Sequence, residues 1–202
     1  MNVGLEQLVD RYGLRLTNNF LDEATCLNII AAMHASEAKA ATIHGYRDSA
    51  HVYDRIRKVT RLELPPAIIE SVSKRLLDHK RTLEQHFSLS LHDCENPQFL
   101  RYNVGDFFVA HQDGNTGLLR LTSDAERKVS VVIFLNGQSE YADSGTYSGG
   151  SLKFSDYSAE PPYDEFELPV SPGMLVAFRS ELTHEVTPVT RGQRYSIVSW
   201  YR

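Results

Sequence analysis

A series of short strand-like segments in the second half of the chain constrains its fold most strongly. From residue 97 onward, runs rich in apolar and β-branched residues end at turn signals such as Asn136-Gly137, Pro172-Gly173 and Arg191-Gly192. The predicted strands lie near residues 98–103, 107–113, 128–135, 151–154, 165–170, 174–178, 184–189 and 194–201. So many short strands in roughly 100 residues predict a mainly β fold, either a sandwich or a jelly roll.

Helical periodicity dominates the residues before this series. Residues 22–35 are predicted to form a helix, for which Asp22 is a suitable N-terminal cap. A longer helix is predicted over residues 66–87, because Pro65-Pro66 marks a start and apolar residues then recur at helical spacing. This apolar stripe consists of Ile69, Val72, Leu76, Leu83 and Phe87. We therefore expect both helices to pack against one sheet from outside, with residues 56–64 extended.

Length and composition are those of one ordinary globular domain. The 202 residues can bury a sizeable core but are few for two domains. The net charge of −5 gives no basic field that would attract nucleic acid or an anionic membrane. No apolar run approaches the ~18 residues of a membrane span, and the first residues do not resemble a signal peptide. Cys26 and Cys94 are far apart and lack metal-site spacing, which favours reduced thiols and a cytoplasmic location.

A His-x-Asp pair on one predicted strand is the first candidate for chemistry. His111 and Asp113 end the run DFFVAHQD, and residues two apart on a strand point to the same face. His184 lies in a later strand, within ELTHEVTPV. Two imidazoles and one carboxylate leave open positions on an octahedral metal, which suits iron(II) that must also bind a co-substrate and oxygen. Taken singly, each residue also fits a structural role, as a surface strand end or a core histidine.

Arg194 is the next candidate, because it interrupts the otherwise barrel-like run RYSIVSWY. It follows His184 across the turn Thr190-Arg191-Gly192, and a hairpin there would place both side chains on one inner face. A planar guanidinium suits a bidentate bridge to a carboxylate. Ser196 follows two residues later, so its hydroxyl can face the same anion.

These motifs resemble, in the same order, those of the prolyl 4-hydroxylase family of 2-oxoglutarate- and iron(II)-dependent dioxygenases. The likeness covers roughly residues 97–201, and it is strong for the oxygen-sensor-type prolyl hydroxylases in HEV and RYSIVSWY. The segments that carry it are FLRYNVGDFFVAHQD, the Gly-Gly strand start GGSLKF, PGMLVAF and HEVTPVTRGQRYSIVSWY.

The resemblance implies a double-stranded β-helix, or jelly roll, supported by N-terminal helices. It implies Fe(II) as the metal, 2-oxoglutarate and O2 as co-substrates, and ascorbate as an auxiliary reductant. The three candidate metal ligands match the family's iron ligands, and Arg194 matches the anchor of the distal 2-oxoglutarate carboxylate. Tyr102 matches a strand tyrosine that hydrogen-bonds the co-substrate, and Trp200 a tryptophan near the substrate mouth.

Two positions depart from the family's pattern. A tyrosine that helps to hold the distal carboxylate in some relatives corresponds to Phe134, and a threonine used in others corresponds to Leu152. Neither side chain can donate a hydrogen bond, so the second donor must come from elsewhere, with Ser196 and Tyr102 as candidates. Related halogenases lack the carboxylate ligand, and the presence of Asp113 therefore disfavours halogenation.

The resemblance implies hydroxylation of a substrate C–H bond. The expected substrate is a prolyl residue of a peptide or a free proline-like amino acid, and another small metabolite is the alternative. Segments 42–60 and 136–149 are expected to frame the substrate opening as lids. We expect one domain over residues 1–202, with support helices and lid in 1–96 and the catalytic core in 97–202. A zinc hydrolase and a non-catalytic jelly-roll binding module stay open as interpretations from other classes.

Overall fold

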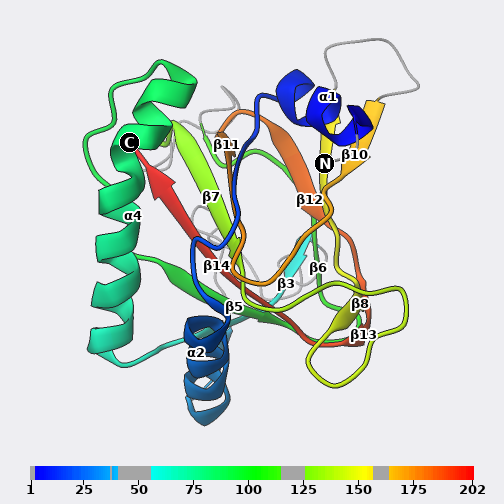
Figure 1. The fold of residues 1–202 in the computed structure, drawn as a ribbon. Helices are drawn as coiled ribbons and strands as arrows, with labels where there is room; N and C mark the ends of the chain where they lie inside the picture. The colour runs from blue at the N-terminus through cyan, green and yellow to red at the C-terminus, as the bar shows by residue number, and fades with distance from the viewer. Residues whose placement is uncertain (1–2, 37, 41–55, 115–125, 157–163) are drawn as a thin grey trace.

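Two antiparallel sheets facing each other form the body of the molecule in the computed structural model (Figure 1). The structure describes residues 3–36, 38–40, 56–114, 126–156 and 164–202. The helices are α1 (Val3–Arg11), α2 (Glu23–Ala35) and α4 (Pro66–Phe87). The larger sheet has the order β1 (Arg15–Thr17), β11 (Leu175–Arg179), β7 (Val129–Phe134), β14 (Arg194–Tyr201), β5 (Gln98–Tyr102), β4 (Thr60–Leu62), β2 (Ala38–Ala40). The smaller sheet has the order β10 (Asp164–Glu167), β9 (Leu152–Asp156), β12 (Thr183–Val186), β6 (Phe107–His111), β3 (Arg57–Lys58).

The order in which the chain visits the two sheets makes the fold a jelly roll. Strands β5, β7, β11 and β14 belong to the larger sheet, and β6, β9 and β12, which alternate with them along the chain, belong to the smaller one. A third, two-stranded sheet joins β8 (Tyr147–Gly149) to β13 (Val189–Gly192). The predicted jelly roll is therefore confirmed, and its two sheets enclose an inner space that neither could enclose alone.

Strand β14 separates the two cores of the protein, because its alternate residues point to opposite faces of the larger sheet. Tyr195 and Ile197 belong to the hydrophobic cluster on the helix-covered face. Val198 packs against the other cluster, which fills the space between the sheets. Arg194 and Ser196 share the parity of Val198, and so β14 presents both polar side chains to the inner space.

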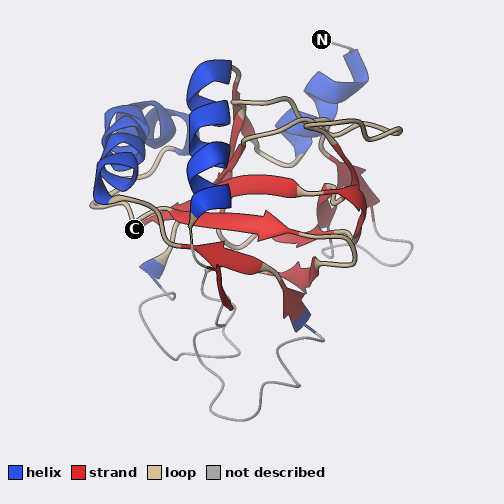
Figure 2. Ribbon diagram, turned by 90° about the horizontal axis from the view of Figure 1, so that it is seen from below, coloured by secondary structure: helices blue, strands red, loops and turns tan. Residues whose placement is uncertain are grey.

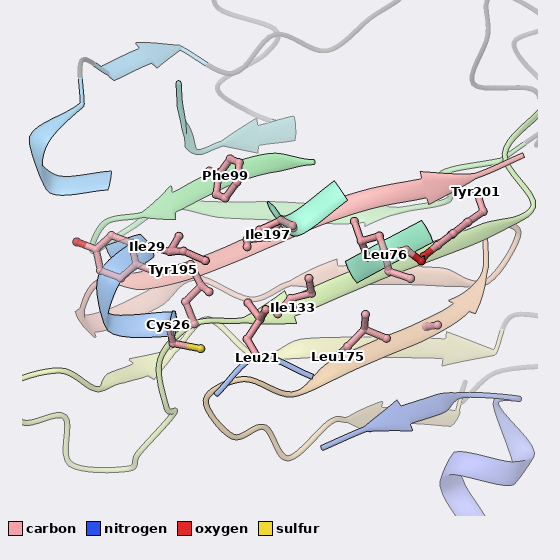
Figure 3. Close-up of a cluster of buried hydrophobic side chains, with 14 of the residues drawn as sticks. Leu21, Cys26, Ile29, Leu76, Phe99, Ile133, Leu175, Tyr195, Ile197 and Tyr201 are labelled. Carbon is pink, nitrogen blue, oxygen red and sulfur yellow. The ribbon is translucent and has the colours of Figure 1, made fainter. Parts of the chain in front are cut away.

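Helices α2 and α4 cover the outer face of the larger sheet, as the periodicity predicted (Figures 1 and 2). The Asp22 side chain caps α2 by accepting a hydrogen bond of 2.7 Å from the backbone N–H of Thr25. Figure 3 shows side chains of both helices, Ile29 and Leu76 among them, meeting strand residues such as Ile133 and Ile197. This helix layer excludes water from one face of the sheet.

Leu76 gives a direct measure of how much this helix layer stabilises the fold. Its side chain is 0% exposed, whereas that of the neighbouring Leu77 is 51% exposed. Leu76→Ala is expected to lower the free energy of unfolding by about 2–5 kcal/mol, because it leaves a cavity in the core. Leu77→Ala, the matched control, should cost less than about 0.5 kcal/mol in a urea titration. Similar losses for both variants would contradict the packing of α4 described here.

Several local features differ from the sequence-based prediction. Helix α1 was not predicted, and it packs Leu5, Leu8 and Val9 against the inner cluster. Residues 190–192 were interpreted as a turn, yet they belong to β13, which pairs with β8. The predicted hairpin between His184 and Arg194 is consequently wrong, because β12 and β14 belong to different sheets. The two side chains share one inner space because the sheets face each other.

Candidate metal and co-substrate site

His111, Asp113 and His184 meet between the two sheets and form a group that could hold a metal ion. One potential ligand atom from each residue lies within 4.8 Å of the others. The Asp113 carboxylate is 3.5 Å from His111 Nε2 and 3.4 Å from His184 Nε2. His111 and His184 are direct partners across β6 and β12, which explains how residues far apart in sequence become neighbours.

Hydrogen bonds on the far side of each imidazole fix which nitrogen can bind a metal. His111 Nδ1 lies 2.8 Å from the carbonyl oxygen of Val109, and His184 Nδ1 lies 3.0 Å from that of Leu182. A carbonyl can only accept, so each Nδ1 must carry the proton and each Nε2 keeps its lone pair. Both lone pairs therefore lie on the Asp113 side, as ligation of one ion requires.

Asp113 lies just beyond the end of β6, rather than on the strand as predicted. The backbone N–H groups of Asp113 and Gly114 both donate to the carbonyl of Ser180, at 2.9 Å each, and this bend turns the carboxylate inward. Gly114 is required there, because a Cβ would come within 2.9 Å of both the Arg127 carbonyl oxygen and the Ser180 side chain.

The pKa shifts of Asp113 and His111 favour the protonation states that bind a cation. Burial alone would raise the pKa of the Asp113 carboxyl, but the two imidazoles, His184 first, hold it well below its usual range because their protonated forms attract the carboxylate and donate to it. Burial, together with the neighbouring His184, lowers the pKa of His111. Near neutral pH, Asp113 is thus a carboxylate and His111 a neutral imidazole, which are the forms that bind metals.

Arg194 is the largest fully buried side chain of the inner space. It is 1% exposed, and no Asp or Glu forms an ion pair with it within the part of the chain that the structure describes. Nη1 donates to the Ser196 hydroxyl at 2.8 Å, whereas Nε has no partner among the described residues. The guanidinium carbon lies 5.0 Å from the ring centre of Tyr102 and 5.3 Å from that of Phe134.

Such a guanidinium indicates that an anion belongs beside it. A buried charge without a counter-ion is costly, and a carboxylate offers the two acceptors that an arginine fork can use. Two imidazole nitrogens, one carboxylate and a separate buried guanidinium fit a metal and a dicarboxylic co-substrate such as 2-oxoglutarate. Of the predicted co-substrate residues, Ser196 positions Arg194 and Tyr102 packs its ring beside it.

Tyr147 is a residue of this site that the sequence analysis missed. It is 0% exposed, and its hydroxyl has no hydrogen-bond partner among the described residues. Burial raises the pKa of this hydroxyl, and the nearby Arg194 guanidinium partly opposes that rise. A Cβ placed on Gly150 would lie 3.2 Å from Arg194 Cδ and 3.3 Å from Tyr147 Cε2, so the two side chains border the same glycine. The Gly-Gly step therefore leaves room for both.

The remaining expectations have varied outcomes. Lys153, a second cation on the strands around the site, faces away from the inner space and pairs with Glu165 and Glu185. Trp200 lies on the inner-facing parity of β14, 7% exposed, with the Arg127 guanidinium 3.8 Å from its ring centre. Its place at a substrate mouth stays a prediction.

The two expected lids are only partly described. Residues 42–55 of the segment 42–60 lie outside the described residues. In the other segment, 136–149, internal hydrogen bonds hold the loop, among them those from Asn136 to the Gly145 carbonyl and from Ser148 to the Ser139 carbonyl. A role of either segment as a lid stays a prediction. No helix within the described ranges is long and apolar enough to cross a membrane.

Two solved structures share the fold of this chain. A Pseudomonas putida prolyl-4-hydroxylase superposes with a TM-score of 0.70 at 23% identity, covering 100% of this chain and 98% of that one. A prolyl hydroxylase from Trichoplax adhaerens superposes with a TM-score of 0.67 at 16% identity, covering 98% and 86%. At these identities the likeness supports the jelly-roll fold.

Sequence comparison places the second half of the chain in a family. A PKHD-type hydroxylase of Shewanella oneidensis is 32% identical over 133 residues, which is 65% of this chain and 52% of the relative. One from Acinetobacter baylyi is 34% identical over 110 residues, 54% and 44% respectively. The chain thus spans about half the length of the curated relatives it matches. The family model described as the 2OG-Fe(II) oxygenase superfamily matches residues 97–202, a range that contains all the candidate site residues. The chain therefore belongs to the 2OG-Fe(II) oxygenase superfamily.

Proposed function

We propose that this protein is an iron(II)- and 2-oxoglutarate-dependent hydroxylase. In this proposal His111, Asp113 and His184 bind the iron, and Arg194 binds the distal carboxylate of 2-oxoglutarate. The observation that carries the proposal is the fully buried Arg194, which lacks a carboxylate partner among the described residues. Its side chain faces the same inner space as the three candidate metal ligands. A buried guanidinium beside a metal-ligand group disfavours a zinc hydrolase and a non-catalytic binding module, because neither needs a fixed anchor for a dicarboxylic co-substrate.

The roles of the protein's own groups follow from their positions. When bound, iron(II) and 2-oxoglutarate supply the oxidising chemistry that inserts an oxygen atom into a C–H bond. The backbone carbonyls of Val109 and Leu182 hold the two imidazoles in the tautomer that presents Nε2. Arg194 orients the co-substrate through its far end, and Ser196 fixes the guanidinium. Phe154 and Phe178 pack around His184 and keep water away from that side of the site.

For the substrate, we infer a prolyl group or a proline-like amino acid. The support is the likeness to PKHD-type hydroxylases and to two prolyl hydroxylase structures. The Trichoplax protein is described in complex with a peptide fragment of a hypoxia inducible factor, so a peptide is the first form to test. A small metabolite stays the alternative. A cytoplasmic location and a need for ascorbate stay predictions, and the free cysteines Cys26 and Cys94 are consistent with the former.

Turnover of 2-oxoglutarate tests this proposal. Purified protein supplied with iron(II), ascorbate and 2-oxoglutarate in air should release succinate, and release should increase with the true substrate. Proline-containing peptides and free amino acids should be screened in parallel for a mass gain of one oxygen atom. Zinc(II) in place of iron(II) is the control, because zinc has no redox chemistry and should give no succinate. Absence of succinate under all conditions, in protein shown to bind iron, would refute the proposal.

A further inference from the structure

The phenolic hydroxyl of Tyr147 is a buried polar group that makes no well-formed hydrogen bond to the described residues. The hydroxyl is enclosed beside the Arg194 guanidinium, which can donate to it, but the described residues give its own proton no acceptor. Buried hydroxyls nearly always have a partner, because leaving water without one costs free energy. The Tyr147 hydroxyl is an exception, and it lies beside the equally buried guanidinium of Arg194. We therefore expect one ligand to contact both groups.

The chemistry of the two groups restricts what that ligand can be. An arginine has donors only, so it cannot accept the proton of the Tyr147 hydroxyl. That proton needs an acceptor, as does the unpaired Nε–H of Arg194. One carboxylate supplies two acceptor oxygens and one negative charge, and so it can satisfy the hydroxyl and the guanidinium together.

Tyr147 also offers a hydrogen-bond donor near the position where Phe134 has none. The Phe134 ring lies 5.3 Å from the guanidinium carbon but carries no donor. Ser196 accepts a hydrogen bond from Arg194 Nη1 and keeps its own proton to donate, whereas Tyr102 presents the face of its ring to the same guanidinium. Strand β8 approaches from another side, since Tyr147 pairs with Gly192 of β13, two residues before Arg194. The Tyr147 hydroxyl on this strand is thus a hydrogen-bond donor beside the Arg194 guanidinium.

We propose that the Tyr147 hydroxyl donates a hydrogen bond to the distal carboxylate of 2-oxoglutarate, beside Arg194, and so makes the site selective for 2-oxo acids that end in a carboxylate. This inference rests on the proposed function, because it assumes that 2-oxoglutarate is the co-substrate. Tyr147 touches the end of that molecule away from the metal. Its role is therefore binding and selection rather than the chemical step.

Binding without turnover tests the assignment. The Kd of 2-oxoglutarate is measured by calorimetry on the Mn(II)-loaded protein without oxygen, beside that of 2-oxopentanoate, a 2-oxo acid of equal length with a methyl end. Tyr147→Phe should raise the Kd of 2-oxoglutarate about 10- to 100-fold, as expected for a lost hydrogen bond to a charged group. The Kd of 2-oxopentanoate should not change. Tyr195→Phe is the matched control, because its hydroxyl bonds to Gln193 and His34 on the opposite face of the sheet.

The thermal stability of the ligand-free variants gives a second, independent readout. Tyr147→Phe should leave Tm unchanged or raise it, because it removes an unpartnered hydroxyl, whereas Tyr195→Phe should lower it. An equal rise in Kd for both 2-oxo acids, or an unchanged Kd for 2-oxoglutarate, would overturn the role of Tyr147 alone. Failure of the wild-type Mn(II) protein to bind 2-oxoglutarate would instead refute the proposed function and this inference together.

Discussion

Asp113→Ala is expected to abolish 2-oxoglutarate turnover and to weaken iron binding while the fold is retained. The carboxylate is the only anionic ligand in the His111, Asp113 and His184 group, and it lies between the two imidazoles. Without it, two neutral imidazoles must hold a divalent cation alone. Loss of an outer-shell partner of a metal ligand already costs about 10- to 100-fold, so turnover should fall by more than about 100-fold. Succinate release and iron content after gel filtration would be measured together.

The control for this variant is Asp164→Ala. Asp164 lies on β10 and forms a surface ion pair with Arg11, away from the triad, so its removal should leave turnover within about twofold of wild type. Circular dichroism should show that both variants keep the wild-type fold. Normal succinate release by Asp113→Ala would show that the triad is not the metal site.

Arg194→Leu is expected to raise the apparent KM for 2-oxoglutarate by two to nearly four orders of magnitude. The variant would leave the distal carboxylate buried without its partner, a loss on the order of 3–5 kcal/mol. Iron affinity should change little, because Arg194 is not part of the metal-ligand group. The ligand-free variant should be at least as stable as wild type, since the guanidinium is buried without a carboxylate among the described residues. Initial rates at varied 2-oxoglutarate and a urea titration measure the two effects.

Two variants sharpen this test. Arg194→Lys should be partly tolerated, because the charge survives while the bidentate fork is lost. Lys153→Leu should leave KM unchanged, because Lys153 pairs with Glu165 and Glu185 on the outer side of the smaller sheet. An unchanged KM in Arg194→Leu would mean that the co-substrate is anchored elsewhere.

The fold was predictable where one local pattern decided it. Helices α2 and α4 begin and end within one residue of their predicted positions, because caps and apolar spacing are local signals. Strands β8 and β13 were missed, because such short, glycine-containing segments resemble turns until their pairing partner is known. The relation between His184 and Arg194 was misjudged for a similar reason, since the assignment of β12 and β14 to opposite sheets is a property of the whole fold.

The candidate site was predictable to the extent that residue order carried the information. The sequence indicated the triad and Arg194, and the structure brings the triad together and buries the arginine nearby. Tyr147 could not be found in this way, because it precedes Gly149-Gly150 in a segment that looked like an exposed lid. Only tertiary packing encloses its hydroxyl and places it beside Arg194. The absence of a donor at Phe134 was the one signal that a partner had to exist.

The most direct test of this account is a crystal structure of the protein grown without oxygen, with Mn(II) in place of iron and with 2-oxoglutarate. The account predicts a manganese anomalous peak bound by Nε2 of His111, Nε2 of His184 and the Asp113 carboxylate. It also predicts that the 2-oxo acid end of 2-oxoglutarate lies on the metal and that its distal carboxylate lies on Arg194. Manganese bound away from the three ligands, or a distal carboxylate that does not contact Arg194, would contradict it.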